Sequence, residues 1–347
     1  MASYHEQKKA QDVKRLREIL AQLPAFLGLY FSSLSDQTSS LTRVGYAYDL
    51  RIFFNFLSEE LLNNRPLHEI TLDDLKTVES EHLQAFMEYL TFYFPAGESE
   101  EALQNAPLGK SRKLAAVRTM FRYFYMQKKL PANPAELISF PKIVSKHITV
   151  LEIDEIAKLL DEVESGEKLS PRQQVFHEIT KLRDAAIITL LLGTGMRVSE
   201  CVGIDINDID FEVGGIKVTR KGGDEMILYF GEEVATALEK YLAIRNETVA
   251  LDGHENAVFL SIQNRRITDR AVQKMVKKYA SLVTRLKNIS PHKLRSTFGT
   301  QLYAETGDIY LVANVLGHAD VNTTRKHYAK MDENHRKRAA NAVRLRE

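Results

Sequence analysis

The chain is poor in cysteine: Cys201 is the only one among 347 residues, so no internal disulfide can form. This scarcity excludes a disulfide scaffold and favours a reducing compartment. The first twenty residues are charged from their start and lack the apolar core of a signal peptide. The most apolar run, residues 185–192, is far shorter than the about 20 residues that span a bilayer. We therefore expect a cytoplasmic protein without a membrane segment.

The chain also has almost no net charge, since 47 Lys and Arg residues stand against 46 Asp and Glu residues. This balance argues neither for nor against a polyanionic partner. The apolar fraction of 44% and the charged fraction of 27% are ordinary for globular proteins, which excludes a disordered or collagen-like chain. At roughly 100–200 residues per domain, the length predicts two domains.

Along the sequence, however, the charges are segregated. Residues 110–130 hold seven basic residues and no acid, and residues 264–288 hold eight basic residues against Asp269 alone. Eight basic residues and three acids follow from Val321 to the end, whereas acids gather at residues 152–164. Such segregation can build a phosphate-binding surface on a neutral protein. The alternative, that these runs are solvated helix faces, stays open at this point.

Hydrophobic periodicity predicts a helical first half and a mixed second half. Prolines at 131, 134 and 141 interrupt the helical pattern, so we place the boundary between Phe140 and Thr149, with domains at 1–143 and 149–347. The fold class that we expect is mainly α with a small antiparallel β-sheet. In the first domain the expected helices cover residues 5–22, 39–62, 80–94 and 111–129, with a loop at 95–108.

The second domain should begin with a helix at 151–163 and a polar stretch at 164–172. Residues 181–192 are apolar on nearly every face, which predicts a buried core helix. Two β-prone runs, 215–220 and 225–230, flank Lys221-Gly222-Gly223-Asp224 and predict a hairpin. After the hairpin the expected helices cover residues 232–245, 267–285, 290–305, 308–316, 323–330 and 333–345.

Three short motifs carry polar side chains suited to chemistry. Ser290 and Pro291 are typical of an N-cap and of position N1, so His292 and Arg295 should share one face at a helix start, where the helix dipole favours anions. Arg197 follows a glycine turn and begins a new helix, and a partly buried arginine there needs a partner such as Glu200. Gly317, a predicted helix C-cap, precedes His318, and Tyr328 lies on a further helix. Each motif alone is more often structural.

Taken together, these elements resemble the tyrosine site-specific recombinases of the phage-integrase family. In that family two arginines, a hairpin lysine, two histidine-type positions and a tyrosine surround one DNA phosphate. The resemblance covers the second domain, and the helical first domain is similar to the family's core-binding domain. Residues 218–223 and the long N-terminal helix look most like the single-component Xer recombinases. The residues that carry the resemblance are Arg197, Glu200, Lys221, His292, Arg295, Gly317, His318 and Tyr328.

The spacing before the tyrosine departs from the common family pattern. Most members place the tyrosine nine residues after the histidine of Leu-Gly-His, whereas Tyr328 lies ten residues after His318 and His327 occupies the usual position. One residue is a rotation of roughly 100° on a regular helix. The Thr-Thr-x-x-His-Tyr variant resembles one in phage-type integrases, so Tyr328 remains the expected nucleophile, with the extra residue absorbed at the helix start.

The resemblance implies a role for each residue. Arg197 and Arg295 would clamp the phosphate oxygens, and Tyr328 would attack phosphorus to form a 3′-phosphotyrosine. His292 would accept the tyrosine proton, and Lys221 would protonate the leaving 5′-oxygen. His318 would donate a hydrogen bond to the phosphate, and Glu200 would orient the histidine and arginine side chains. No nucleotide-binding loop and no cysteine–histidine zinc spacing is present, so we expect neither cofactor nor metal.

The resemblance also implies partners. These are a double-stranded recombination site, a homotetramer on two duplexes that exchanges strands through a Holliday junction, and a C-terminal helix over 332–347 that docks on a neighbouring subunit; an accessory protein is compatible with this scheme. We expect chromosome dimer resolution, with a mobile-element integrase or excisionase, a type IB topoisomerase and a non-catalytic DNA-binding regulator as alternatives. The residues expected to face DNA are all basic: Arg43, Arg51, Lys110, Arg112, Lys113, Arg118, Arg122, Arg265, Arg266 and Lys274.

Overall fold

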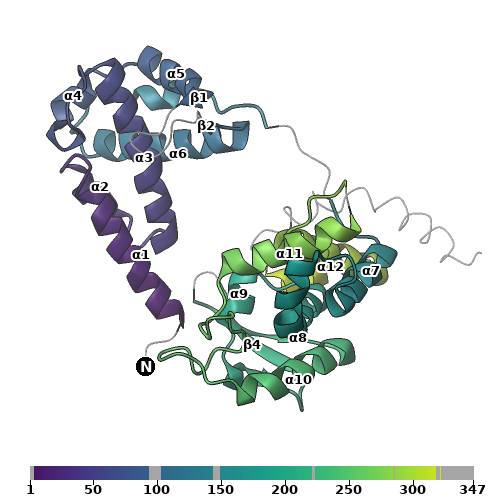
Figure 1. Cartoon of the computed structure of the whole chain (residues 1–347). Helices are drawn as coiled ribbons and strands as arrows, with labels where there is room; N and C mark the ends of the chain where they lie inside the picture. Colours follow the sequence, from purple (N-terminus) through teal and green to yellow (C-terminus); the bar gives the residue numbers. More distant parts are fainter. Residues whose placement is uncertain are drawn as a thin grey trace, which may run out of the picture. The chain divides into compact units, whose positions relative to one another are not determined.

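The computed structural model describes residues 4–93, 103–143, 149–220, 223–284, 286–317 and 321 (Figure 1). The chain divides into two compact units, Met1–Ser145 and Lys146–Glu347. Both are mainly helical and each carries a small antiparallel sheet, which confirms the expected fold class. None of the helices in the described ranges is long and apolar enough to cross a membrane.

The first unit is a bundle around the long helix α3, which packs against α1 and α6 (Figure 1). Its centre is aromatic: the ring of Phe53 meets those of Phe86 and Phe121 edge-on, at centroid distances of 5.1 and 6.1 Å. The side chain of Ser39 caps α3 by accepting the amide of Thr42. The elements are α1 (Tyr4–Leu20), α2 (Leu27–Ser33), α3 (Ser40–Glu60), η1 (Leu67–Glu69), α4 (Leu72–Lys76), α5 (Ser80–Tyr89), β1 (Phe92–Tyr93), β2 (Leu103–Gln104), α6 (Pro107–Met126) and η2 (Pro134–Leu137).

The second unit is organised around the helix α8, which packs against α7, α10 and α12. Beside these helices lies a sheet of order β3-β4-β5, in which Ile216 pairs with Leu228 across the predicted hairpin. The elements are α7 (Ile153–Ser165), α8 (Pro171–Thr194), α9 (Val198–Gly203), η3 (Ile206–Asp208), β3 (Ile209–Asp210), β4 (Gly215–Thr219), β5 (Glu225–Tyr229), α10 (Glu232–Glu247), α11 (Asp269–Val283), α12 (Pro291–Thr306) and α13 (Ile309–Leu316).

Three sequence-based boundaries are wrong. Helix α5, expected to cover residues 80–94, ends at Tyr89 because the chain turns into the short strand β1 at Phe92–Tyr93. Helix α8 begins at Pro171, not at 181, because Ser170 and Gln173 form a capping box that starts it earlier. Its added first turns are largely solvent-facing, and their apolar residues Val175, Phe176 and Ile179 are exposed, so they do not continue the buried pattern on which the prediction depended. Helix α6 likewise begins at Pro107, within the segment expected to be loop, with proline at the first helical position.

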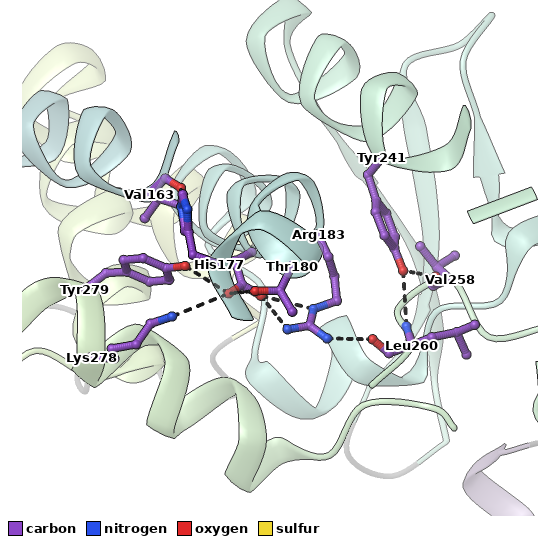
Figure 2. A network of polar contacts seen from close by, with 10 residues as sticks. Val163, His177, Thr180, Arg183, Tyr241, Val258, Leu260, Lys278 and Tyr279 are labelled. Carbon is purple, nitrogen blue, oxygen red and sulfur yellow. Dashed lines mark hydrogen bonds and ion pairs between the residues drawn. The ribbon is translucent and has the colours of Figure 1, made fainter. Parts of the chain in front are cut away.

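A buried polar network holds α8 to α11 in the second unit (Figure 2). The carboxylate of Asp184 is 1% exposed and accepts hydrogen bonds from Arg183 Nη2 at 2.6 Å, Thr180 Oγ1 at 3.1 Å and the Tyr279 hydroxyl at 3.1 Å. The Arg183 guanidinium also donates to the carbonyl of Leu260. A buried charge needs such partners. The network therefore fixes the helix whose C-terminal end leads into the candidate site.

Candidate active site

The site is built on the turn that ends α8. Gly195 lies there with φ +63°, a left-handed conformation that favours glycine. A Cβ at this position would come within 2.3 Å of Phe298 Cδ1 on α12 and 3.0 Å of Leu316 Cδ2 on α13. The glycine thus lets the turn approach both helices closely. Arg197 follows two residues later as the N-cap of α9.

Arg197 and Glu200 form the predicted pair. The Arg197 backbone amide and its Nη1 each donate to the Glu200 carboxylate at 2.7 Å. The Glu200 side chain is 3% exposed, whereas one third of the Arg197 side chain reaches solvent. Glu200 therefore fixes the arginine from the interior and leaves part of the guanidinium accessible. Contact between Glu200 and a histidine stays a prediction.

Arg295 lies in the second turn of α12 and is 4% exposed. Its Nη1 donates to the carbonyl of Gly195 at 2.7 Å, and its Nη2 donates to the carbonyl of Leu316. His292, one turn earlier, is exposed. Ser290 occupies the N-cap position and Pro291 is the first residue of α12, as predicted, but the Ser290 side chain makes no capping hydrogen bond.

The C-terminal end of α13 is where the arginines meet. A helix leaves its last carbonyls unsatisfied and carries partial negative charge at this end. Here the carbonyls of residues 314–317 all accept side-chain hydrogen bonds from guanidinium groups. Arg220 donates to the first two, Arg295 to the third and Arg197 to the fourth, at 3.1 Å. Three segments distant in sequence thus converge on one helix end.

Arg220 had no role in the sequence-based assignment. Its Nη2 donates to the carbonyl of Val315 at 2.7 Å. Burial lowers the pKa of the Arg220 guanidinium, and the neighbouring positive charge of Arg197 acts in the same direction, while Glu200 opposes both. The one available signal was its place in the sequence, directly before Lys221.

Three of the seven predicted catalytic residues fall outside the described residues. They are Lys221, His318 and Tyr328, and the predicted C-terminal docking helix at 332–347 falls outside as well. Two of the three adjoin described positions, because Lys221 follows Arg220 and His318 follows Gly317. The described part of the site thus comprises Arg197, Glu200, His292 and Arg295.

In the first unit, several candidate DNA-facing cations have internal partners. Lys113 is 5% exposed and its Nζ donates to Asn105 Oδ1 at 2.9 Å, so this side chain faces the interior. Arg112 pairs with the buried Asp49 at 2.8 Å. Arg118 donates to the carbonyls of residues 135, 136 and 138.

The other first-unit candidates differ in their exposure. Lys110 donates to the carbonyl of Met87 at 3.0 Å and is partly buried. Arg43 is partly buried as well, and the partly buried Arg51 places its guanidinium 5.0 Å from the Tyr48 ring centroid. Arg122 is exposed.

In the second unit, Arg266 is also turned inward. Its Nη1 donates to the carbonyls of Val202 and Ile204, and its side chain is 9% exposed. Arg265 and Lys274 are exposed. Lys113 and Arg266 therefore hold the fold, and the surface that we consider for DNA excludes both.

The catalytic unit matches a known family. The model described as the phage integrase family matches residues 149–335. A tyrosine recombinase XerC of Thermodesulfovibrio yellowstonii is 32% identical over 307 residues, which cover 87% of this chain and 89% of that relative.

Solved structures show the same fold at lower identity. The XerH site-specific recombinase bound to palindromic difH substrate, in a post-cleavage complex, superposes with a TM-score of 0.66 at 22% identity, covering 94% of this chain and 88% of that one. A lambda integrase tetramer bound to a Holliday junction gives a TM-score of 0.60 at 16% identity, covering 87% of this chain and 77% of that one. The chain belongs to the phage integrase family, and it is a tyrosine recombinase that resembles the Xer enzymes.

Proposed function

We propose that this recombinase cleaves one strand at a specific DNA site through a 3′-phosphotyrosine on Tyr328, and that its biological role is chromosome dimer resolution. The observation that carries the proposal is the convergence of Arg197 and Arg295 on successive carbonyls, those of Gly317 and Leu316, directly before His318. Two guanidinium groups held side by side suit the two non-bridging oxygens of one phosphodiester.

The reaction balances with side chains alone. The Tyr328 oxygen attacks phosphorus, a P–O bond to tyrosine forms, and the P–O5′ bond breaks. His292 takes the tyrosine proton, and Lys221 gives a proton to the leaving 5′-oxygen. Arg197, Arg295 and His318 stabilise the negative charge that grows on the phosphate oxygens. The unperturbed tyrosine pKa is about 10, so a positively charged site is needed to make the attack fast at neutral pH.

The covalent intermediate keeps the energy of the phosphodiester. A 5′-hydroxyl from another strand can therefore reverse the step and rejoin DNA without ATP. Repeating the exchange on the second pair of strands passes through a four-way junction. We infer a homotetramer on two duplexes for this purpose, supported by the lambda integrase tetramer of like fold. Because the proposed substrate is chromosomal DNA, we infer that the protein works in the cytoplasm.

A mobile-element integrase is the second candidate. The ten-residue step from His318 to Tyr328 favours it, because the Thr-Thr-x-x-His-Tyr variant resembles phage-type enzymes. The XerC relative, matched over most of its length, favours dimer resolution. Binding and cleavage assays on the host's chromosomal resolution site and on the ends of resident mobile elements decide between the two roles.

A nicked suicide substrate tests the proposed chemistry. Cleavage beside the nick releases a short fragment, so the covalent protein–DNA complex accumulates. We expect the wild-type chain to form this complex without added metal or ATP, and the Tyr328→Phe variant to bind the same DNA without forming it. An adduct that persists in the variant would overturn the assignment of the nucleophile.

The assembly is tested by removing residues 334–347, which make up most of the predicted docking helix at 332–347. We expect the truncated chain to fold and bind one site, while tetramer formation and coordinated cleavage are lost. Recombination at the wild-type rate would reject a role for this helix between subunits.

A further inference from the structure

Arg220 closes the hairpin turn that contains Lys221. The Arg220 amide donates to the carbonyl of Asp224 at 2.7 Å, and the Gly223 amide donates to the carbonyl of Arg220 at 3.0 Å. These two hydrogen bonds therefore fix the backbone of residue 220 at the start of the turn. Lys221 is the next residue, and consecutive Cα atoms lie about 3.8 Å apart.

The side chain of Arg220 reaches a different element. Its Nη2 donates to the carbonyl of Val315 at 2.7 Å, and its Nη1 lies 3.4 Å from the carbonyl of Asn314. A Cβ added at Gly317 would lie 1.7 Å from Arg220 Nη1, so the guanidinium occupies the space that this glycine leaves. Gly317 directly precedes His318. The Arg220 side chain thus connects two places in the chain. One is the position directly before Lys221, the predicted proton donor, and the other is the helix end directly before His318, the predicted phosphate ligand.

Capping of α13 accounts for only part of this arrangement, namely the hydrogen bond from Arg220 Nη2 to the carbonyl of Val315. The Gly317 amide already donates to the carbonyl of Asn314 at 2.9 Å. Arg295 and Arg197 donate to the carbonyls of Leu316 and Gly317. A third guanidinium adds like charge to the cluster. Its Nε is also buried without a hydrogen-bond partner among the described residues, which carries a desolvation cost. A contact that opposes stability in these respects is better explained by a role in the reaction.

We propose that Arg220 is a positioning residue that fixes the backbone directly before Lys221 to the C-terminal end of α13. It touches no reacting atom. Its effect is on the step proposed for Lys221, the transfer of a proton to the 5′-oxygen as the P–O5′ bond breaks. This inference rests on the proposed function, because it takes Lys221 as the proton donor.

The test compares two forms of one suicide substrate, with oxygen or sulfur at the bridging 5′ position. A thiolate leaves without a proton donor, so a defect in proton donation disappears on the sulfur substrate. The variants are Arg220→Met, which removes the donors, and Arg220→Lys, which retains one. Lys217→Met is the matched control, since Lys217 lies on β4, the strand directly before Arg220, and its side chain is 52% exposed. The readout is the single-turnover rate of covalent complex formation.

We expect Arg220→Met to slow cleavage of the oxygen substrate by roughly tenfold or more, since general acid catalysis contributes roughly 10²–10⁴-fold. On the sulfur substrate it should react within about twofold of the wild-type rate. Arg220→Lys should recover part of the loss, and Lys217→Met should match wild type on both.

Equal losses on the two substrates, or no loss on either, would overturn the proposal. If Arg220→Met fails to fold, the comparison rests on Arg220→Lys, which must show the same selectivity for the oxygen substrate. Failure of the wild-type chain to form any adduct would instead reject the proposed function, so the two failures are distinguishable.

Discussion

Arg295 Nη1 donates a 2.7 Å hydrogen bond to the carbonyl of Gly195, one hundred residues earlier in the chain. The bond ties the start of α12 to the turn that places Arg197. The Arg295 side chain also donates to the carbonyl of Leu316 at the end of α13. It therefore stabilises the packing of these segments, and it is also the more buried of the two arginines in the proposed phosphate clamp.

This double role predicts the effect of Arg295→Ala. Loss of the guanidinium should slow cleavage by orders of magnitude with a modest change in DNA affinity. Two buried carbonyls would also lose their donor, which should lower the free energy of unfolding by about 1–3 kcal/mol for each carbonyl. Arg295→Lys retains the charge. Its loss in the free energy of unfolding should therefore be smaller than the rise in its activation free energy for cleavage. Urea unfolding and single-turnover cleavage measure the two effects, and an unchanged rate would remove Arg295 from the clamp.

Gly195→Ala should disrupt the site through the backbone. The left-handed φ and the collision with Phe298 together predict a loss of about 2–4 kcal/mol in the free energy of unfolding. Gly28→Ala is the matched control, because Gly28 has no neighbour within 4 Å of an added Cβ. It should leave stability unchanged or slightly raised. Equal melting temperatures for the two variants would contradict the proposed packing of this turn.

The first unit should show a pH dependence from Asp49. Burial raises the pKa of this carboxyl to about 6, although Arg112 and Lys113 limit the rise. Between about pH 4 and 6 the folded state binds more protons than the unfolded state. Stability from this group is therefore present below its unfolded pKa and is lost as pH rises through 6, by about 3 kcal/mol at most.

Asp49→Asn should abolish that slope. The measurement is urea unfolding at several pH values, followed by hydrogen exchange of peptides from α3 and α6. Wild type should lose stability relative to Asp49→Asn as the pH rises across this window. Parallel pH profiles for wild type and Asp49→Asn would contradict this prediction, because they would show that Asp49 titrates at the same pH in the folded and the unfolded state.

Exposed basic residues and inward-facing basic residues should differ in their effect on DNA binding. Arg122→Ala and Lys274→Ala each remove an exposed cation and should reduce the slope of log affinity against log salt by about 1. Lys113→Met and Arg266→Met remove inward-facing cations, so they should lower thermal stability and keep the salt slope. Fluorescence anisotropy with site DNA over a series of salt concentrations measures the slopes. Equal slopes in all four variants would reject this division of the basic surface.

Local features of the site were predictable from the sequence. The N-cap and first residue of α12, the glycine that ends α13 and the pairing of Arg197 with Glu200 depend on neighbours within a few positions. The periodic pattern of the long helices was likewise sufficient to place most of them. Short-range interactions decide these features, so the sequence contains their signal directly.

Features that depend on distant segments were not predictable. The basic run at 110–130 gave no sign that Lys113 turns inward, because its carboxylate partner Asp49 lies on another helix. Nor could the motifs show that Arg220 shares the end of α13 with Arg197 and Arg295, since only packing brings these segments together. Strands β1, β2 and β3 are two residues each, too short for an alternating pattern to appear.

The identity of the residue that carries the DNA tests the account most directly. The covalent complex trapped on a nicked site can be digested with protease and nuclease, and the modified peptide sequenced by mass spectrometry. We predict a nucleotide phosphate on Tyr328 and an unmodified His327, despite the longer spacing from His318. An adduct on any other side chain, or no adduct with DNA that is bound and cut, would contradict the proposed mechanism.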